Sequence, residues 1–204
     1  MIKRILYLIL LFSLSFSQSQ INKVINNKYL LLNDGSLYEI TSYVGYQYWS
    51  PYSFVDIIDD IKMIYKDEEY YISKIEGSQY QIDEVFNDNY ILFNDGSLYE
   101  ITSYVGYKNW SSYDDVYIID DKKMLYDDEE YTVERVNEKN IERTNIRRVS
   151  EDLPYYISLV NGKTYFTIDV KPGIWLDYSR VIVIEQEYMI HTSLDHIISV
   201  TRVR

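Results

Sequence analysis

Short runs of apolar and polar residues, separated by turn residues, fill the chain from about residue 20 onward. The first stretch contains five such runs, which are Tyr29–Leu32, Ser36–Ser42, Phe54–Ile58, Lys62–Tyr65 and Tyr70–Ile75. Their Tyr, Ile and Val content favours β-strands. Between the first two runs, Asp34-Gly35 is a strong hairpin signal because both residues tolerate positive φ. We expect no long helix, and at most one or two helical turns in the charged stretch Glu138–Arg148.

The same pattern occurs a second time at an offset of 61 residues. Asn33–Tyr46 and Asn94–Tyr107 are identical, and the match continues without gaps over about fifty residues. A third, divergent copy keeps the order of the signals, with Asn161-Gly162 at the hairpin turn. Self-similarity at a fixed period predicts a chain of repeated structural modules.

Each copy has too few and too short strands for a large sheet. Closure into a small barrel buries one face of each strand and protects the strand edges. We therefore expect an all-β protein of three tandem small five-stranded barrels, with repeat 1 over residues 20–77, repeat 2 over 81–138, a charged linker over 139–152 and the divergent repeat 3 over 153–204. The alternative is one continuous sandwich that runs across the repeats.

The N-terminus has the pattern of an export signal, which we place at residues 1–17. Lys3 and Arg4 precede the apolar run Ile5–Phe16, and Ser15 and Ser17 are small residues at the usual spacing before a cleavage point. A run of twelve apolar residues is shorter than the roughly 20 that a membrane span needs. We expect a secreted, periplasmic or cell-surface protein without membrane insertion after cleavage. An uncleaved anchor or a buried strand is the alternative.

The amino-acid composition excludes several kinds of catalytic and binding site. The chain contains no cysteine, so thiol nucleophiles, disulfides and thiolate metal sites are excluded. Its net charge of −12 argues against nucleic acid as a partner. The 24 tyrosines are better explained by the strand preference of this residue and a compositional bias than by a set of stacking platforms.

The tryptophans are the best binding candidates in the sequence. Trp49, Trp110 and Trp175 each stand in the long loop before the third predicted strand of their copy. An exposed Trp can stack on a sugar ring or fill a partner's pocket. The structural interpretation, which we favour, is a plug that closes the end of a small barrel.

Other candidates for catalysis or metal binding are weaker. Neighbouring carboxylates such as Asp59-Asp60 point to opposite faces of a strand and do not converge on one bond. Acidic turns such as Asp127–Glu130 leave weak Ca²⁺ binding open. His191 and His196 occur only in the third copy, and we expect them at its surface or edge. We therefore predict no catalytic residue, no metal site and no cofactor.

Charge is unevenly distributed along the chain. The second copy is strongly acidic, whereas the segment that follows it contains Arg143, Arg147 and Arg148. This asymmetry suits either a basic partner or intramolecular packing of these arginines on the acidic copy.

The number and length of the strands and the long loop after the second strand resemble the SH3-like small-barrel architecture. The third copy, "LVNGKTYFTIDVKPGIWLDYSRVIVIEQEYMIHTSLDHIISVTRV", also resembles uncharacterised exported bacterial repeats. Those repeats combine a "DG" or "NG" hairpin, an aromatic residue inside the next strand, a loop Trp and a "VIV" strand, and the resemblance implies no active site.

These observations predict a non-enzymatic exported protein that binds or scaffolds an unknown protein or cell-surface polymer through several modules. The alternatives are an extracellular hydrolase acting on polysaccharide or peptide, and a structural surface component that associates with itself through strand edges.

Overall fold

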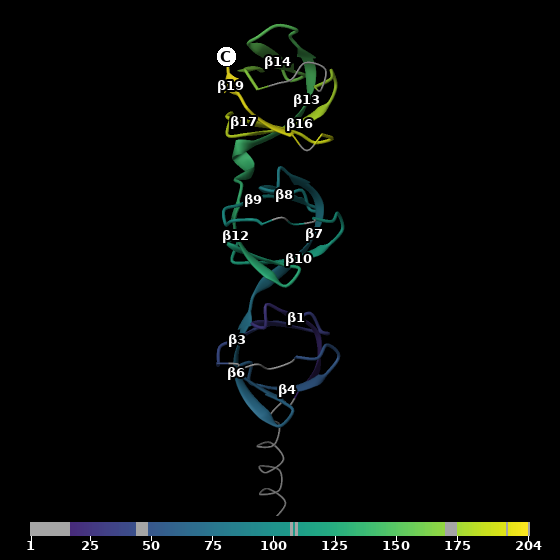
Figure 1. The fold of residues 1–204 in the computed structure, drawn as a ribbon, viewed down its shortest axis with the longest axis vertical. Helices are drawn as coiled ribbons and strands as arrows, with labels where there is room; N and C mark the ends of the chain where they lie inside the picture. Colours follow the sequence, from purple (N-terminus) through teal and green to yellow (C-terminus); the bar gives the residue numbers. More distant parts are fainter. Residues whose placement is uncertain are drawn as a thin grey trace, which may run out of the picture. The chain divides into compact units, whose positions relative to one another are not determined.

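The computed structural model describes residues 17–43, 49–106, 108, 110–169, 175–194 and 196–203. Within them the protein is all-β, with antiparallel sheets and one short 3-10 turn, η1 (Glu138–Asn140) (Figure 1). This confirms the predicted fold class at the level of all-β tandem modules. The expected signal peptide, residues 1–17, lies outside the described residues apart from Ser17, which begins the first strand.

The first copy is a closed barrel with the strand order β1-β2-β3-β6-β5-β4. Its strands are β1 (Ser17–Ile25), β2 (Tyr29–Leu32), β3 (Leu37–Ile40), β4 (Phe54–Ile58), β5 (Lys62–Tyr65) and β6 (Glu68–Ile75). The bounds predicted for β2, β4 and β5 are confirmed, and those of β3 and β6 differ by a few residues. The predicted turn is also confirmed, because Gly35 has φ +85° and its N–H donates to the Leu32 carbonyl at 3.0 Å.

The prediction of five strands per barrel is wrong, because β1 adds a sixth. The pattern of apolar runs does not predict β1, because most of its residues are polar and its register shifts between Ile21 and Lys23. It nevertheless joins the barrel on both sides, pairing with β2 and with β4. The start of repeat 1 therefore moves from residue 20 to Ser17.

The second copy is a closed barrel of the same kind, with the order β10-β11-β12-β9-β8-β7. Its strands are β7 (Gly77–Phe86), β8 (Tyr90–Phe93), β9 (Leu98–Ile101), β10 (Asp115–Ile119), β11 (Lys123–Tyr126) and β12 (Glu129–Arg135). Because β7 begins at Gly77, the predicted start of repeat 2 at residue 81 is four residues late.

The third copy is a seven-stranded sheet in the order β18-β17-β16-β13-β14-β15-β19, which differs from the closed barrel predicted for it. Its strands are β13 (Ile141–Val149), β14 (Tyr155–Leu159), β15 (Thr164–Thr167), β16 (Arg180–Ile184), β17 (Tyr188–His191), β18 (His196–Ser199) and β19 (Thr201–Arg202). The order matches that of the barrels if β18 and β19, separated by Val200, together take the place of β6. Among the described strands, each pairs only with strands of its own copy, which contradicts the continuous-sandwich alternative.

The linker predicted for residues 139–152 is also wrong. Ile141–Val149 forms β13, the central strand of the third sheet, which pairs with β14 and β16. Ile146 is nevertheless fully buried, and Val149 packs against the core of the third copy. The adjacent charged pairs Glu142-Arg143 and Arg147-Arg148 leave no clear strand alternation in the sequence, and the third copy therefore begins near residue 141 rather than at 153.

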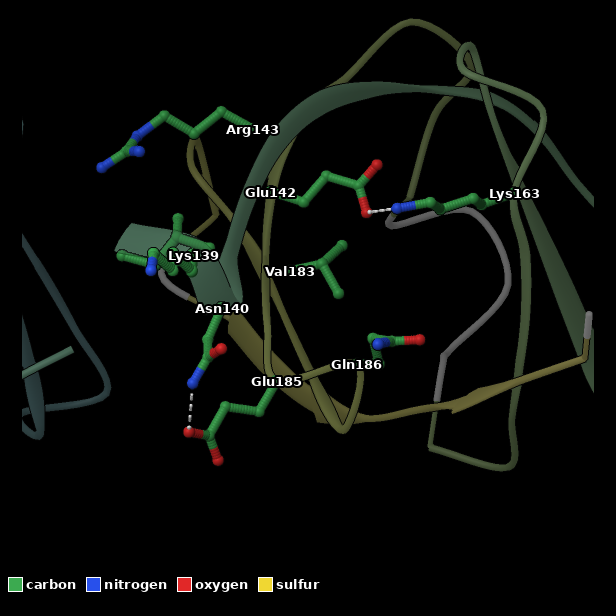
Figure 2. A pocket seen from close by; sticks show the side chains of 9 residues that line it. Lys139, Asn140, Glu142, Arg143, Lys163, Val183, Glu185 and Gln186 are labelled. Carbon is green, nitrogen blue, oxygen red and sulfur yellow. Dashed lines mark hydrogen bonds and ion pairs between the residues drawn. The ribbon is translucent and has the colours of Figure 1, made fainter. Parts of the chain in front are cut away.

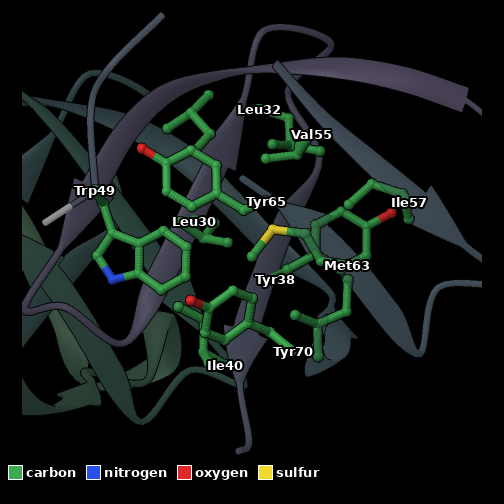
Figure 3. Close-up of a cluster of buried hydrophobic side chains, with 12 residues drawn as sticks. Leu30, Leu32, Tyr38, Ile40, Trp49, Val55, Ile57, Met63, Tyr65 and Tyr70 are labelled. Atoms are coloured by element: carbon green, nitrogen blue, oxygen red, sulfur yellow. The ribbon is translucent and has the colours of Figure 1, made fainter. Parts of the chain in front are cut away.

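Aromatic and aliphatic side chains fill the interior of the first barrel (Figure 3). Trp49 lies against Tyr65 and Tyr70, with ring centroids 5.1 and 4.9 Å apart. The corresponding cluster of the third copy is built around Trp175, Ile146 and Met189. Each of these two copies therefore has its own core, as the repeat predicts.

Buried tyrosines link the cores to acidic turns. Tyr38 donates a hydrogen bond to Asp60 at 2.5 Å, and Tyr99 donates to Asp121 at 2.5 Å, one repeat later. Burial and the neighbouring carboxylate raise the pKa of both hydroxyls. The acidic pairs Asp59-Asp60 and Asp120-Asp121 are therefore structural turns that anchor a core tyrosine.

Raised tyrosine pKa values predict that the fold is weakened by alkali. Burial, followed by Glu68, raises the pKa of Tyr70 to about 12, and burial, followed by Glu100, raises that of Tyr90 to about 12. Each group favours folding fully below its unfolded pKa near 10, and this contribution is lost as pH rises toward 12. Urea unfolding between pH 8 and 12 is expected to show falling stability, and Tyr70→Phe is expected to flatten the fall. A profile that Tyr70→Phe leaves unchanged would contradict the assignment.

The described residues form two compact units. Unit 1 extends to Ser78 and also includes Tyr117–Asp120 and Met124–Glu130, whereas the other described residues belong to unit 2. Each unit contains an apolar cluster on the outside of its barrel, in addition to the interior cores.

Candidate functional site

The structure places two of the three tryptophans in the core, as the interpretation of these residues as structural plugs predicts, and not as exposed binding platforms. Trp49 and Trp175 are core residues with 5% and 4% of their surface exposed, and Trp110 is half-buried beside Tyr131, with ring centroids 5.5 Å apart. The indole N–H of Trp49 is buried and has no acceptor among the described residues, so packing alone holds this ring. Trp49 and Trp175 are therefore plugs.

Trp175, the plug of the third copy, lies between His191 and His196. The indole N–H of Trp175 donates to Nδ1 of His196 at 3.3 Å, and its ring meets the His191 ring edge-on at 5.1 Å. Only 3% of His191 is exposed, so the prediction of a surface position for this residue is wrong. Its interior position follows from β17, whose last three residues are all buried.

His191 is expected to make the third copy sensitive to acid. Burial lowers the pKa of its imidazole, so the folded state resists a proton that the unfolded chain accepts. Stability is therefore fully present above about pH 6.5 and is lost as pH falls through the lowered pKa. Thermal unfolding between pH 7 and 4 is expected to show this loss, and His191→Phe is expected to reduce it. An equal loss in the variant would contradict the prediction.

A tyrosine follows each tryptophan at a spacing of three residues, in the sequences "WSPY", "WSSY" and "WLDY". These tyrosines, Tyr52, Tyr113 and Tyr178, expose 70%, 78% and 76% of their surface. Each copy thus has an exposed phenol three residues after its indole, which is buried in the first and third copies and half-buried in the second.

The three tyrosines share an unusual backbone conformation. Their φ values are +68°, +73° and +69°, in the left-handed region that bulky L-residues rarely adopt. In each copy the residue after the tyrosine donates its N–H to the carbonyl three residues earlier, at 3.2, 3.3 and 3.2 Å. The tyrosine therefore occupies the third position of a tight turn, where glycine is the usual residue.

The first strand of each copy holds this turn in place. The tyrosine N–H donates to the carbonyl of Ile21, Ile82 or Ile146 at 2.7, 2.7 and 2.6 Å, respectively. An amide side chain holds the tyrosine carbonyl in two copies, from Gln20 to Tyr52 at 2.7 Å and from Asn145 to Tyr178 at 2.9 Å. The backbone is thus fixed at both ends, and the phenol ring extends into solvent.

The sequence reading missed these tyrosines because it weighed only the tryptophans in the loop. The signal was available, since the spacing Trp-x-x-Tyr is the same in all three copies. Sequence alone, however, does not show which of the two aromatic residues faces the core. That distinction depends on the turn, which reverses the direction of the side chain.

A cavity of about 650 Å³ lies beside β13, β16 and the end of η1 (Figure 2). Several of its polar side chains pair with one another: Lys163 lies 2.8 Å from Glu142, and the Asn140 amide donates to Glu185 at 3.1 Å. Arg143 pairs with Glu138 at 3.1 Å and also donates to the carbonyl of Gly96 in the second copy. This last contact confirms intramolecular packing of one of the arginines.

In the part of the chain that the structure describes, no group of three or more His, Asp or Glu side chains is placed to hold a metal ion. The same residues include no helix with the length and apolarity needed to cross a bilayer.

Comparisons with family models, with curated proteins and with solved structures found no match to this chain. Among the described residues, the repeated tyrosine turn is the feature that most favours a binding function.

Proposed function

We propose that the chain is an exported, non-enzymatic binding or scaffold protein, built from SH3-like small barrels, that contacts its partner through Tyr52, Tyr113 and Tyr178. The observation that carries this proposal is one exposed tyrosine in the same left-handed turn of every copy. Its partner is an unknown protein or cell-surface polymer.

The turn would be more stable with another residue. A non-glycine side chain in the left-handed region costs roughly 1–2 kcal/mol, and glycine removes that steric penalty. The exposed ring contributes little burial in return. Strained conformations that persist despite their cost are concentrated at functional sites. The turn is kept in the divergent third copy, although the residues between Trp and Tyr change from Ser-Pro to Leu-Asp.

Tyrosine is suited to recognition. Its ring offers a large rigid apolar face, and its hydroxyl can donate and accept hydrogen bonds. The net charge of −12 disfavours polyanionic partners. One modest contact per copy, repeated along a linked chain, gives avidity because later contacts form intramolecularly.

Replacing all three tyrosines by glycine tests the proposal. The purified wild-type chain, immobilised on beads, is expected to retain material from the envelope fraction of the producing cell. Because avidity is lost with the contacts, the Tyr52→Gly/Tyr113→Gly/Tyr178→Gly variant is expected to bind about 10²- to 10⁴-fold more weakly. Each single variant should lose much less.

The matched control is Tyr71→Thr. Tyr71 is also exposed, at 63%, but lies in β6 outside the turn, and the second copy has Thr132 at this position. The control should bind like the wild type. Recovery of nothing above background by the wild type, or equal recovery by the triple variant, would contradict the proposal.

A further inference from the structure

The outer surfaces of the barrels carry a repeated contact. Along β2, Leu30 and Leu32 point into the barrel, whereas Tyr29 and Leu31 point outward and are also buried. We call the outward side chains of β1–β3 and of the end of β6 the head face; in the first copy it consists of Ile25, Tyr29, Leu31, Leu37 and Ile75.

Within unit 1, the head face packs against Tyr117, Ile119 and Leu125. These three residues point outward from β10 and β11, and we call their positions the tail face. Tyr29 adds a polar contact at the same place, because its hydroxyl donates to Glu130 at 2.7 Å. Ile119 and Leu125 are 6% and 1% exposed, so water is excluded from the contact.

Unit 2 contains the same contact one repeat later. The head face of the second copy has residues exactly 61 positions further on, namely Phe86, Tyr90, Leu92, Leu98 and Val136. They pack against Ile182, Ile184 and Ile190 of β16 and β17. By strand register these isoleucines are the tail face of the third copy. Two separate parts of the chain thus use one head-to-tail geometry.

This geometry leaves one head face and one tail face without a partner in the described residues. The unused head face belongs to the third copy, where strand register places Ser150, Ser158 and Thr164 at the positions of Phe86, Leu92 and Leu98. Its Tyr156 is 45% exposed, and the surface beside Ser150 and Ser158 is hollowed by a cavity of about 460 Å³. Three positions that hold apolar residues in the second copy therefore hold Ser or Thr in the third copy.

The unused tail face belongs to the first copy. It consists of Asp56, Ile58 and Ile64, which are all half-buried. Asp56 stands where the other copies have Tyr117 and Ile182. A carboxylate at this position opposes an apolar contact, because burying a charge without a partner is costly.

We propose that the head and tail faces form one specific self-recognition surface, and that polar residues on the third head face and the first tail face stop it from joining one chain to another. A head-to-tail contact between identical chains leaves a free face at each end, so an uncapped chain would add further chains into a ring or a filament. Repeat proteins need terminal units with polar outer faces for the same reason. The hydroxyls and Asp56 therefore act as caps.

Mixing two variants tests this proposal without requiring a heavily altered chain. The head variant is Ser150→Phe/Ser158→Leu/Thr164→Leu, and the tail variant is Asp56→Tyr. In sedimentation velocity, the wild type and each variant alone are expected to have the mass of one chain. An equimolar mixture is expected to shift to a 1:1 complex of twice that mass, and a chain with all four substitutions to grow with concentration.

A blocked tail variant, Asp56→Tyr/Ile58→Lys/Ile64→Lys, is the control and should not bind the head variant. Circular dichroism checks that each variant is folded. The proposal is overturned if folded head and tail variants do not associate, if the blocked tail binds equally well, or if the wild type already assembles through these faces.

Discussion

Replacing Trp49 by Ala is expected to lower the free energy of unfolding of the first barrel by about 3–5 kcal/mol. The ring is 5% exposed and contacts Tyr65 and Tyr70 within a barrel that has few other residues to fill the space (Figure 3). The alanine variant would contain a cavity where the indole was, and the neighbouring side chains of a small, close-packed core cannot shift enough to fill it. The loss is of the same order as the whole stability of a small domain.

Urea unfolding followed by far-ultraviolet circular dichroism measures this effect. Tryptophan fluorescence is unsuitable, because the substitution removes Trp49, the tryptophan of the first copy. Tyr52→Gly, three residues away in the same loop, is the matched control. It removes an exposed ring and relieves the left-handed backbone, so stability should stay the same or rise by up to about 1 kcal/mol. If Trp49→Ala were as stable as the wild type, the plug assignment would fail.

Phe86→Ala is expected to cost about 3–5 kcal/mol although Phe86 lies outside the barrel interior. Phe86 is fully buried in the apolar cluster of unit 2, together with Leu98, Ile184 and Ile190. The alanine would open a cavity between the second and third copies. Because both copies border that cavity, the loss should also separate their unfolding transitions.

Ser150 provides the comparison, since strand register places it at the same position in the third copy. Ser150→Ala opens no cavity between copies and removes mainly the hydrogen bond that the Ser150 hydroxyl accepts from the Tyr156 N–H at 2.7 Å, so it should change the stability by only about 1 kcal/mol. Differential scanning calorimetry of both variants measures the two effects and shows whether one transition becomes two. Equal small effects at the two positions would mean that the copies unfold independently.

Much of the architecture could be predicted from the sequence because it is local. Runs such as Phe54–Ile58 and Lys62–Tyr65 have their observed bounds, since residue type and turn chemistry act within a few residues. The duplication also predicted equivalent closed modules for the first two copies, because identical segments have identical local preferences, whereas the divergent third copy is a seven-stranded sheet. β1 and β13 were missed because their polar residues carry no clear alternation, and pairing on both sides is what makes them strands.

The candidate site depended on tertiary structure. The sequence determined that a Trp and a Tyr recur three residues apart, but only the folded turn assigns Trp49 to the core and Tyr52 to solvent. In the same way, only strand register shows that Phe86 and Ser150 occupy the same position in the second and third copies. Composition and spacing determine local structure, because they act between residues that are close in the sequence. Burial depends on contacts between residues that are distant in the sequence, and those contacts form only when the barrels close and pack on their neighbours.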